Sequence, residues 1–369
     1  MRVRYRRQAA AAGVSVVALT LAIGACSSAG TSAPSGGSTG TATSGGGGSA
    51  NLSGTLNGSG STLQLVYQQA AISAFKSVQS GMTVNYGAGG SGKGRTDLAS
   101  GVVNFAGSDS PIPDKEAANF KGKTVLYYPI LIAPITVSYN LSGVSKLQLS
   151  GPTIAGLFSG KIKTWNDPAV KADNPGVSLP STPVTIAHRS DSSGTTANFT
   201  QFLTEAGGSA WTLGAGSVVN WPGASRGGNG NSGVAQIIRS TPGAVGYVDY
   251  ADAKASSLVF AYIKNKDGQY VAPSVDAASA AASHATIKPD LTFSAIWAPG
   301  ADSYPITAQS WVLVYQTQSS TNNTAMLKAY IGYLVGDGQK LLPDLGYAPL
   351  PSNIDQQAQA AVSKIGSSG

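Results

Sequence analysis

Short apolar segments alternate with helical patterns along this chain, and four of these segments end in turns rich in Gly, Ser, Thr and Asp. The turns lie at residues 58–63, 87–94, 105–111 and 189–196. Strands that alternate with helices predict an α/β fold with mainly parallel sheets. In open sheets of this class, ligands bind beyond the carboxyl ends of the strands, where helix N-termini present free N–H groups. The pattern therefore constrains both the fold class and the place of a binding site.

The expected elements follow from the period of the apolar residues. The run 125–140 is long, apolar and β-branched, which predicts a buried strand. Other strands are expected to begin or lie within the segments 55–62, 82–90, 102–111, 182–203, 242–250 and 306–316. Helices are expected through Leu65, Tyr67 and Phe75, after the turn within 182–203, and over 95–101, 233–240 and 324–335.

The first 25 residues have the layout of a secretory signal peptide. A basic start, MRVRYRR, precedes an apolar stretch at 9–25 that is rich in Ala, Gly, Ser and Thr. A transmembrane helix needs about 20 strongly apolar residues, so a membrane anchor is the weaker interpretation. The segment ends in LAIGAC at 21–26, which resembles a bacterial lipobox and implies cleavage before Cys26 and lipid attachment to its sulfur. The alternative is an ordinary signal peptide with an incidental cysteine.

Residues 26–50 predict a flexible tether. Apart from Cys26, this segment is dominated by Gly, Ser, Thr and Ala and carries no charge, so it cannot bury enough apolar surface to offset its ordering entropy. The folded part is expected to begin near Asn51. Cys26 is the only cysteine of the chain, which excludes a disulfide within it and a cysteine zinc cluster.

Composition narrows the class of protein. The chain has 369 residues, which favours about two domains. Its formal net charge of +7 arises from 24 basic and 17 acidic residues, and four of the arginines lie within residues 1–25, which hold no acid. Removing those four leaves 20 basic residues against 17 acidic ones, a charge of +3. That excess does not indicate a nucleic-acid partner.

The first two turns favour anion binding. Thr62 places a hydroxyl at a predicted helix start, where a plain N-cap is the alternative. The segment 87–94, GAGGSGKG, contains Ser91 and nearly matches a P-loop, but Gly94 stands where a magnesium-binding Ser or Thr should be. Nucleotide hydrolysis is therefore rejected. Consecutive backbone N–H groups of this turn are expected to form an anion nest.

The other two turns carry charge. Asp109 suits a ligand that keeps a proton, because a carboxylate only accepts hydrogen bonds; capping of the next turn is the alternative. Arg189 offers a permanent charge and a planar donor fork for an oxyanion, and Asp191 can orient it. Ser193, Gly194 and Thr195 then open a helix, and a structural ion pair plus a helix cap is the alternative there.

Catalytic and metal-site interpretations have little support. The chain has two histidines, His188 and His284, which lack metal-ligand spacing and are interpreted as scaffold residues. No nucleophile-elbow pattern G-x-S-x-G is present. No catalytic residue, metal or cofactor is predicted.

The four turns in this order, with the segments 156–170, 228–254 and 302–316, resemble the phosphate-binding subunit of bacterial phosphate ABC transporters. The resemblance covers about residues 51–350. It implies an α/β, type II-like periplasmic-binding-protein fold with two lobes, each with a central sheet, joined by hinge strands. One lobe would comprise 51–128 plus 304–369, and the other 129–303.

The same resemblance implies the ligand contacts. The phosphate-binding residues would be Thr62, Leu63 through its backbone N–H, Ser91, Asp109, Arg189, Ser193, Gly194 and Thr195, with Asp191 orienting the arginine. The chain departs from the family pattern at Leu63-Gln64-Leu65, where members often have Phe-Pro and a small residue.

The implied function is capture of inorganic phosphate outside the cell membrane and its delivery to the permease subunits of a phosphate ABC transporter. The protein would be a lipid-anchored monomer and not an enzyme. Two alternatives remain open from the residues: a receptor for another oxyanion such as sulfate or molybdate, and a secreted phosphatase or serine hydrolase that uses Ser193 or Ser91. Asp109 discriminates between the oxyanions.

Overall fold

The computed structural model describes residues 52–223 and 225–367. The predicted signal peptide, Cys26 and the predicted tether lie outside the described residues. Residues Ala50–Gly369 form one compact unit. The boundaries between the two expected lobes remain a prediction.

A nine-stranded mixed sheet organises this unit. Its strand order is β2-β1-β3-β12-β4-β8-β6-β7, and β9 also pairs with β4. The strands are β1 (Gly54–Gly60), β2 (Met82–Ala88), β3 (Phe105–Ser108), β4 (Val125–Tyr139), β6 (Thr185–Arg189), β7 (Ser225–Gly228), β8 (Ala244–Asp249), β9 (Val259–Phe260) and β12 (Thr307–Tyr315). Two small sheets contain β5 (Gln148–Leu149), β10 (Tyr262–Lys264) and β11 (Tyr270–Val271), and β13 (Thr317–Gln318) and β14 (Gly366–Ser367).

The expectation of mainly parallel sheets is wrong at the centre of the large sheet. β1 is parallel to β2 and β3, and β6 is parallel to β7 and β8, as expected for strands joined through helices. β12, however, is antiparallel to both β3 and β4. The cause is the chain path, because β4 runs from the β1–β3 side of the sheet to the β6–β8 side and β12 returns.

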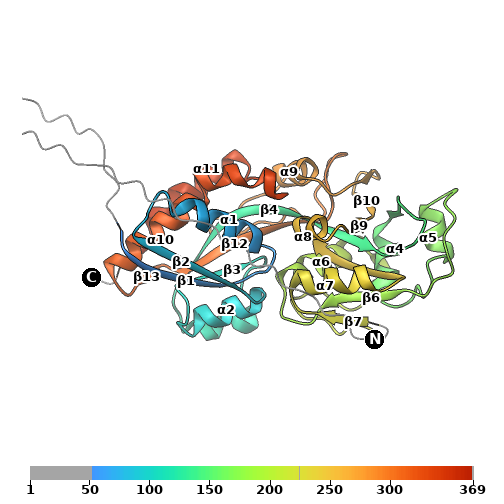
Figure 1. Cartoon of the computed structure of the whole chain (residues 1–369), viewed down its shortest axis with the longest axis horizontal. Coiled ribbons are helices and arrows are strands. Elements are labelled where there is room, and N and C mark those ends of the chain that lie inside the picture. The colour runs from blue at the N-terminus through green and yellow to red at the C-terminus, as the bar shows by residue number, and fades with distance from the viewer. Residues whose placement is uncertain (1–51, 224, 368–369) are drawn as a thin grey trace, which may run out of the picture. The chain divides into compact units, whose positions relative to one another are not determined.

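β4 belongs to both sides of the sheet (Figure 1). Its residues from Val125 to Pro134 pair with β12, and those from Ile135 to Tyr139 pair with β8. All of its residues from Tyr128 onward are buried, which confirms the predicted buried strand. The β12–β4 register shifts between Ser310 and Trp311.

Helices follow the strands that end in the polar turns. The predicted helices are confirmed, although the one expected over 95–101 begins at Ser91. The helices are α1 (Leu65–Phe75), α2 (Ser91–Ala99), α3 (Asp114–Ala117), α4 (Gly151–Phe158), α5 (Pro168–Asp173), α6 (Gly194–Ala206), α7 (Gly230–Ser240), α8 (Tyr250–Ala255), α9 (Val275–Ser283), α10 (Thr321–Leu334) and α11 (Ser352–Ala361).

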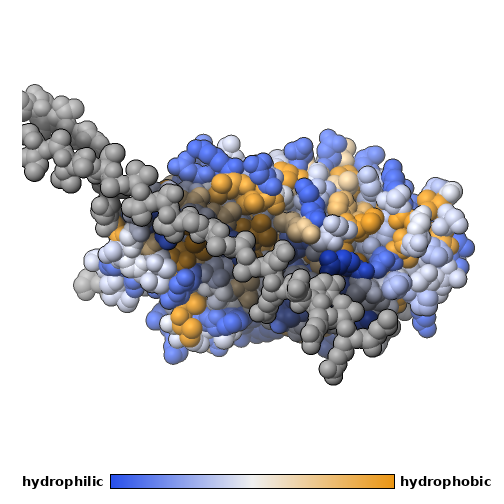
Figure 2. Space-filling view, in the orientation of Figure 1, coloured by the Kyte–Doolittle hydropathy of each residue, from blue (hydrophilic) through white to orange (hydrophobic). Residues whose placement is uncertain are grey.

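The core contains aromatic rings packed both beside the β1–β3 strands and beside the β6–β8 strands of the large sheet. Phe105 of β3 packs against Tyr330 of α10 at a centroid distance of 5.6 Å, and Phe199 of α6 stacks on Tyr247 of β8 at 4.5 Å. Figure 2 shows a largely hydrophilic face with hydrophobic side chains in separate patches. Within the described part of the chain, no helix combines the length and apolar character needed to cross a bilayer.

We expect Gly58→Ala to destabilise the protein. A Cβ at Gly58 of β1 would lie 2.2 Å from the ring of Phe105, and overpacking of this kind costs about 1–3 kcal/mol. Gly332→Ala in α10 is the matched control, because no atom lies within 4 Å of the added methyl and alanine stabilises a helix interior. Urea unfolding should show a lower midpoint for the first variant and an equal or higher one for the second. Equal midpoints for Gly58→Ala and the parent would contradict the close approach.

Candidate functional site

Three of the four polar turns converge because they follow the parallel strands β1, β2 and β3. Ser61 comes directly after β1, Ser91 follows the end of β2 by three residues, and Asp109 comes directly after β3. Since the carboxyl ends of parallel strands meet at one edge of a sheet, these side chains are brought together. All three are buried.

The Asp109 carboxylate is surrounded by hydroxyl donors. Its exposed fraction is 1%. Ser61 Oγ lies 2.6 Å from Oδ1 and 2.7 Å from Oδ2, Ser310 of β12 donates to Oδ1, and Ser91 Oγ lies 3.3 Å from Oδ2. Burial raises the pKa of Asp109 above its ordinary value of 3.8, while the serine hydroxyls and the Arg189 charge oppose that rise. The arrangement supports a buried carboxylate that acts as a hydrogen-bond acceptor.

Arg189, the last residue of β6, is held from two sides. Its Nε donates to Asp191 Oδ1 at 2.7 Å and its Nη2 donates to Asp191 Oδ2. Its Nη1 donates to Asn231 Oδ1 at 2.9 Å and lies 3.4 Å from Thr195 Oγ1. Burial would raise the pKa of Asp191, but the hydrogen bonds and charge of Arg189 together with backbone N–H donors, including that of Gly230, outweigh burial and hold that pKa below 3.8. The guanidinium is therefore fixed in one orientation.

The fourth turn lies directly against the second and the third. A Cβ on Gly194, the first residue of α6, would lie 2.4 Å from Ser91 Oγ and 2.7 Å from Asp109 Cβ. Asn198, one turn further along α6, donates to the Asp109 carbonyl oxygen at 2.5 Å. Only glycine permits this approach, so the N-terminus of α6 is seated on Ser91 and Asp109.

The Gly-rich turn after β2 provides close packing. A Cβ on Gly90 would lie 2.2 Å from Asp191 Oδ2, and one on Gly92 would lie 2.1 Å from Ser192 Oγ. The Gly89 and Gly90 N–H groups both donate to the Gly60 carbonyl, and Gly92 N–H donates to the Ser192 carbonyl. These three amides thus bind protein oxygens, unlike the nest of free amides expected from the sequence.

The remaining predicted residues of the first and fourth turns differ in whether their polar groups have hydrogen-bond partners. Thr62 Oγ1 is buried and has no hydrogen-bond partner. The Leu63 N–H donates to Ser61 Oγ at 3.1 Å. Ser193 Oγ accepts from the Thr196 N–H at 3.1 Å and caps α6. An unpartnered buried hydroxyl is costly, so Thr62 is a group that a ligand could satisfy.

Sequence reasoning missed several polar residues that complete the site. Ser61 lies inside the first predicted turn, but its neighbour Thr62 was the residue predicted to bind the ligand. Ser310 lies in the predicted strand segment 306–316, and Asn231 lies in the segment 228–254 that carries part of the family resemblance. Asn231 Nδ2 donates to Asp249 Oδ2 at 2.5 Å. The polar residues Thr307, Gln309 and Ser310 at the start of an otherwise apolar strand were the one available signal for Ser310.

The histidines make structural contacts. His188 stacks on Trp221 at a centroid distance of 5.3 Å, and its Nδ1 lies 2.8 Å from the Arg189 carbonyl oxygen. His284 lies near Gly300, where an added Cβ would be 3.0 Å from its Nε2. Among residues 52–223 and 225–367, no group of three or more His, Cys, Asp or Glu side chains could hold a metal ion.

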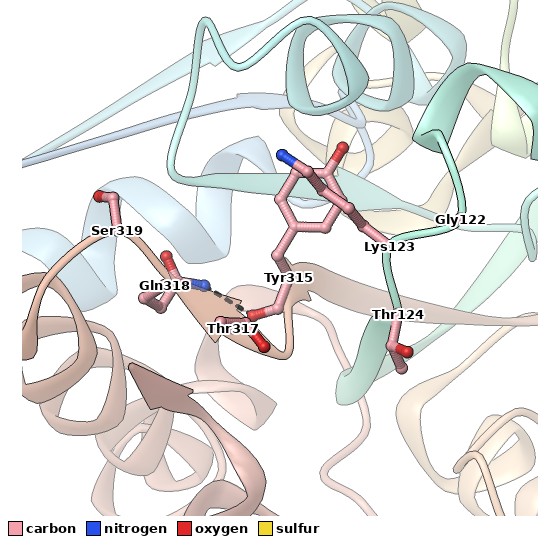
Figure 3. Close-up of a pocket in the computed structure, with 7 residues that line it drawn as sticks. All are labelled: Gly122, Lys123, Thr124, Tyr315, Thr317, Gln318 and Ser319. Atoms are coloured by element: carbon pink, nitrogen blue, oxygen red, sulfur yellow. Dashed lines mark hydrogen bonds between the residues drawn. The ribbon is translucent and has the colours of Figure 1, made fainter. Parts of the chain in front are cut away.

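A pocket of about 530 Å³ lies away from these residues, where β4 begins and β12 ends (Figure 3). Lys123 Nζ lies 5.0 Å from the centroid of the Tyr315 ring there. No predicted site residue lines this pocket, which is formed by Gly122, Lys123, Thr124, Tyr315, Thr317, Gln318 and Ser319.

Comparison with known proteins gives consistent results. Residues 40–338 match the family model described as a PBP superfamily domain. The chain is 35% identical over 323 residues to phosphate-binding protein PstS 3 of Mycobacterium leprae, covering 84% of this chain and 87% of the relative. It is 33% identical over 312 residues to phosphate-binding protein PstS of Pasteurella multocida, covering 83% and 89%.

Solved structures share the fold. A high-affinity periplasmic phosphate-binding protein bound with phosphate, PfluDING, matches with a TM-score of 0.69 at 21% identity, covering 83% of this chain and 93% of that one. A phosphate-binding protein from Stenotrophomonas maltophilia matches with a TM-score of 0.64 at 20% identity, covering 84% and 94%.

We expect Asp109→Asn to change the pH dependence of stability. Because folding raises the pKa of Asp109, its favourable contribution is complete below pH 3.8 and is lost as pH rises through the folded pKa. The free energy of unfolding of the variant relative to the parent should therefore increase from pH 4 to pH 7, as urea titrations can measure.

Asp191→Asn is the matched control for this measurement. Folding lowers the pKa of Asp191, so its contribution is present above pH 3.8 and is lost only as pH falls through the lower folded pKa. The stability difference between this variant and the parent should change little above pH 5, whereas that of Asp109→Asn should continue to rise toward pH 7. The same slope for both variants would contradict the assignment to Asp109.

Proposed function

The chain belongs to the PBP superfamily and to its PstS-type phosphate-binding proteins, and on that premise we propose that it captures inorganic phosphate outside the cell membrane for an ABC transporter. The observation that carries the proposal is the buried Asp109 carboxylate, seated against the N-terminus of α6 and near the charge of Arg189. An acceptor, hydroxyl donors and one fixed cation suit a protonated oxyanion.

The proposed ligand contacts come from all four turns. Thr62 offers a buried hydroxyl that has no protein partner. Ser91 Oγ makes two long contacts with Asp109, accepting from its N–H at 3.2 Å and lying 3.3 Å from Oδ2. The guanidinium of Arg189, the hydroxyls of Ser193 and Thr195, and the backbone N–H groups of Leu63 and Gly194 complete the proposed set. The Leu63 N–H would have to exchange its present acceptor, Ser61 Oγ, for a phosphate oxygen.

Discrimination follows from the proton on the ligand. Phosphate keeps a proton near neutral pH and can donate it to Asp109, whereas sulfate has none to donate. A buried carboxylate that faced sulfate would be left beside a like charge with an unpaired acceptor, which is an expensive arrangement. Asp109 therefore selects phosphate by excluding ions without a proton.

Release of the ligand requires the two sides of the site to separate. We assign 51–128 plus 304–369 to one lobe and 129–303 to the other, because β4 and β12 are the strands of the large sheet that run between the two sides. A phosphate bound to both lobes favours the closed form, which is a hinge-type population shift. The closed form would then deliver phosphate to the permease subunits.

The remaining assignments concern location and activity. A lipid on Cys26 would hold the protein at the extracytoplasmic face of the membrane, and residues 26–50 would let it reach the permease as a monomer. The protein is proposed to bind and not to transform its ligand, because Ser193 Oγ is engaged as a helix cap and the His188 ring is stacked on Trp221.

Titration calorimetry of the purified protein with phosphate, sulfate and molybdate tests this function. The parent should bind phosphate and reject the other two at pH 8. Asp109→Asn should weaken phosphate binding, yet weaken sulfate rejection more, since an amide can donate to an ion without a proton. Arg189→Ala should lower affinity for phosphate by well over tenfold, about 1.4 kcal/mol or more, because a charge-assisted contact is lost.

Two outcomes would refute the proposal. Absence of phosphate binding by the parent would refute the proposed function. Unchanged selectivity in Asp109→Asn would refute the proposed role of the Asp109 carboxylate. A turnover assay with a phosphoester covers the enzymatic alternative, for which the parent should show no activity.

Cys26→Ala should release the exported protein from the membrane. The parent is expected to incorporate labelled palmitate and to sediment with membranes, because stable anchoring depends on buried acyl chains. The variant should lose the label and appear in the soluble or culture fraction with unchanged phosphate affinity. Equal labelling of the variant and the parent would contradict lipidation at this residue.

A further inference from the structure

A line of buried polar side chains runs behind Asp109 from a distant helix. Tyr330 of α10 donates to Gln68 Oε1 at 2.6 Å, and Gln68 Nε2 donates to Gln64 Oε1 at 3.1 Å. Gln64 Nε2 lies 2.7 Å from Ser310 Oγ, and Ser310 Oγ donates to Asp109 Oδ1. Tyr330, Gln68, Gln64 and Ser310 all have an exposed fraction of 0%. Bulk solvent therefore does not reach these contacts.

One backbone carbonyl fixes the direction of every hydrogen bond in this line. Gln64 Nε2 also lies 2.7 Å from the Trp311 carbonyl oxygen, which can only accept. The atom at that position must be the amide nitrogen, so Ser310 Oγ accepts from it and directs its own single hydrogen to Asp109. The Gln64 oxygen must then accept from Gln68 Nε2, and the Gln68 oxygen must accept from the Tyr330 hydroxyl.

Ser61 contributes a second donor of fixed direction. Its Oγ accepts from the Leu63 N–H at 3.1 Å, so its hydrogen is free to point to the Asp109 carboxylate. Asp109 Oδ1 has two short hydroxyl contacts, with Ser61 and Ser310, and both are donors. Oδ2 has one short contact, with Ser61 Oγ at 2.7 Å, and one long contact, with Ser91 Oγ at 3.3 Å, and Ser61 has a single hydrogen to share between the two oxygens. The two carboxylate oxygens are thus unequal.

We propose that Gln64 and Ser310 are the positioning residues that make Asp109 a proton acceptor, keeping its Oδ1 supplied with donors and leaving Oδ2 to take the proton of the ligand. This inference rests on the proposed function, phosphate capture, and deepens it. Donors directed at Oδ1 stabilise the ionised carboxylate and disfavour the neutral acid. A neutral Asp109 carboxyl could donate a hydrogen bond, and would then admit sulfate.

Two neighbouring features agree with this role. A Cβ on Gly107 would lie 2.6 Å from Gln64 Oε1, so glycine is needed for the amide to reach Ser310. Gln64 also lies in the segment that departs from the sequence pattern of the family, and here that segment supplies a donor to the site.

Other ionisable groups that face Asp109 must be held constant in a test. The guanidinium of Arg189 favours the ionised carboxylate. The hydroxyls of Tyr86 and Tyr347 lie close enough for the Asp109 charge to raise the pKa of each, although burial is the larger cause for both. None of these groups is altered by substitution of Gln64 or Ser310.

The experiment measures the affinities for sulfate and for phosphate from pH 4 to pH 8 in the parent, Ser310→Ala and Gln64→Met. Sulfate should begin to bind as Asp109 takes up a proton. Loss of one donor should move the midpoint of sulfate binding upward by about one pH unit in Ser310→Ala, since one hydrogen bond to a charged group is worth about one pKa unit or more. Phosphate affinity at pH 8 should change by less than about tenfold in both variants.

Two further variants separate this role from a merely structural one. Ser310→Thr keeps the hydroxyl and should restore the midpoint of the parent. Tyr67→Phe removes another buried hydroxyl of α1, which donates to the Leu334 carbonyl outside the line, and should leave the midpoint unchanged. If Gln64→Met does not fold, the pair of Ser310 variants decides alone.

A midpoint in Ser310→Ala equal to that of the parent, in protein that still binds phosphate, would overturn the proposal. Equal weakening of phosphate and sulfate at every pH would do the same, because it would indicate a packing defect alone. A parent that binds no phosphate at any pH would instead overturn the proposed function.

Discussion

The burial of one ionised carboxylate is the constraint on which the site depends. Asp109 has an exposed fraction of 1%, and a charge in that position is tolerated only when donors replace the water it has lost. Its donors come from Ser61 after β1, Ser91 at the start of α2 and Ser310 within β12. The parallel order of β1, β2 and β3 and the place of β12 beside β3 are therefore conditions for the carboxylate to exist there.

The opposite charge is stabilised on the other side of the site. Arg189 ends β6, and Asp191 and Asn231 hold its guanidinium while Gly194 brings the start of α6 against Asp109. In the proposed site, the acceptor for a ligand proton and the cation for ligand charge would thus belong to different parts of the sheet. The donors to the Asp109 carboxylate and the acceptors of the Arg189 guanidinium each come from their own part, so a ligand that used both groups would gain its binding energy only when the two parts meet.

The strands and helices that the sequence predicted are present, because period and turn chemistry are local properties, but it did not predict β7, α4, α9 or α11. It did not predict that β12 returns antiparallel beside β4, or that Ser310 would contact Asp109 across 201 residues of sequence. The prediction of a nest of free amides in the Gly-rich turn was wrong for a related reason. Glycines 90 and 92 permit contact with Asp191 and Ser192. The sequence alone does not distinguish a glycine that a ligand approaches from one that another loop approaches.

An irregularity in the central strands connects the fold to the chemistry of Asp109. Between Ser310 and Trp311 the register skips Ile130 of β4, and a bulge of this kind leaves carbonyl groups outside the ladder. Buried carbonyls need partners, and here glutamine side chains supply them: Gln64 donates to the Trp311 carbonyl and Gln339 donates to that of Ile130. The amide that satisfies the bulge is the one that orients the Ser310 hydroxyl. A requirement of backbone pairing in β12 thereby sets the direction in which the Ser310 hydroxyl donates to Asp109.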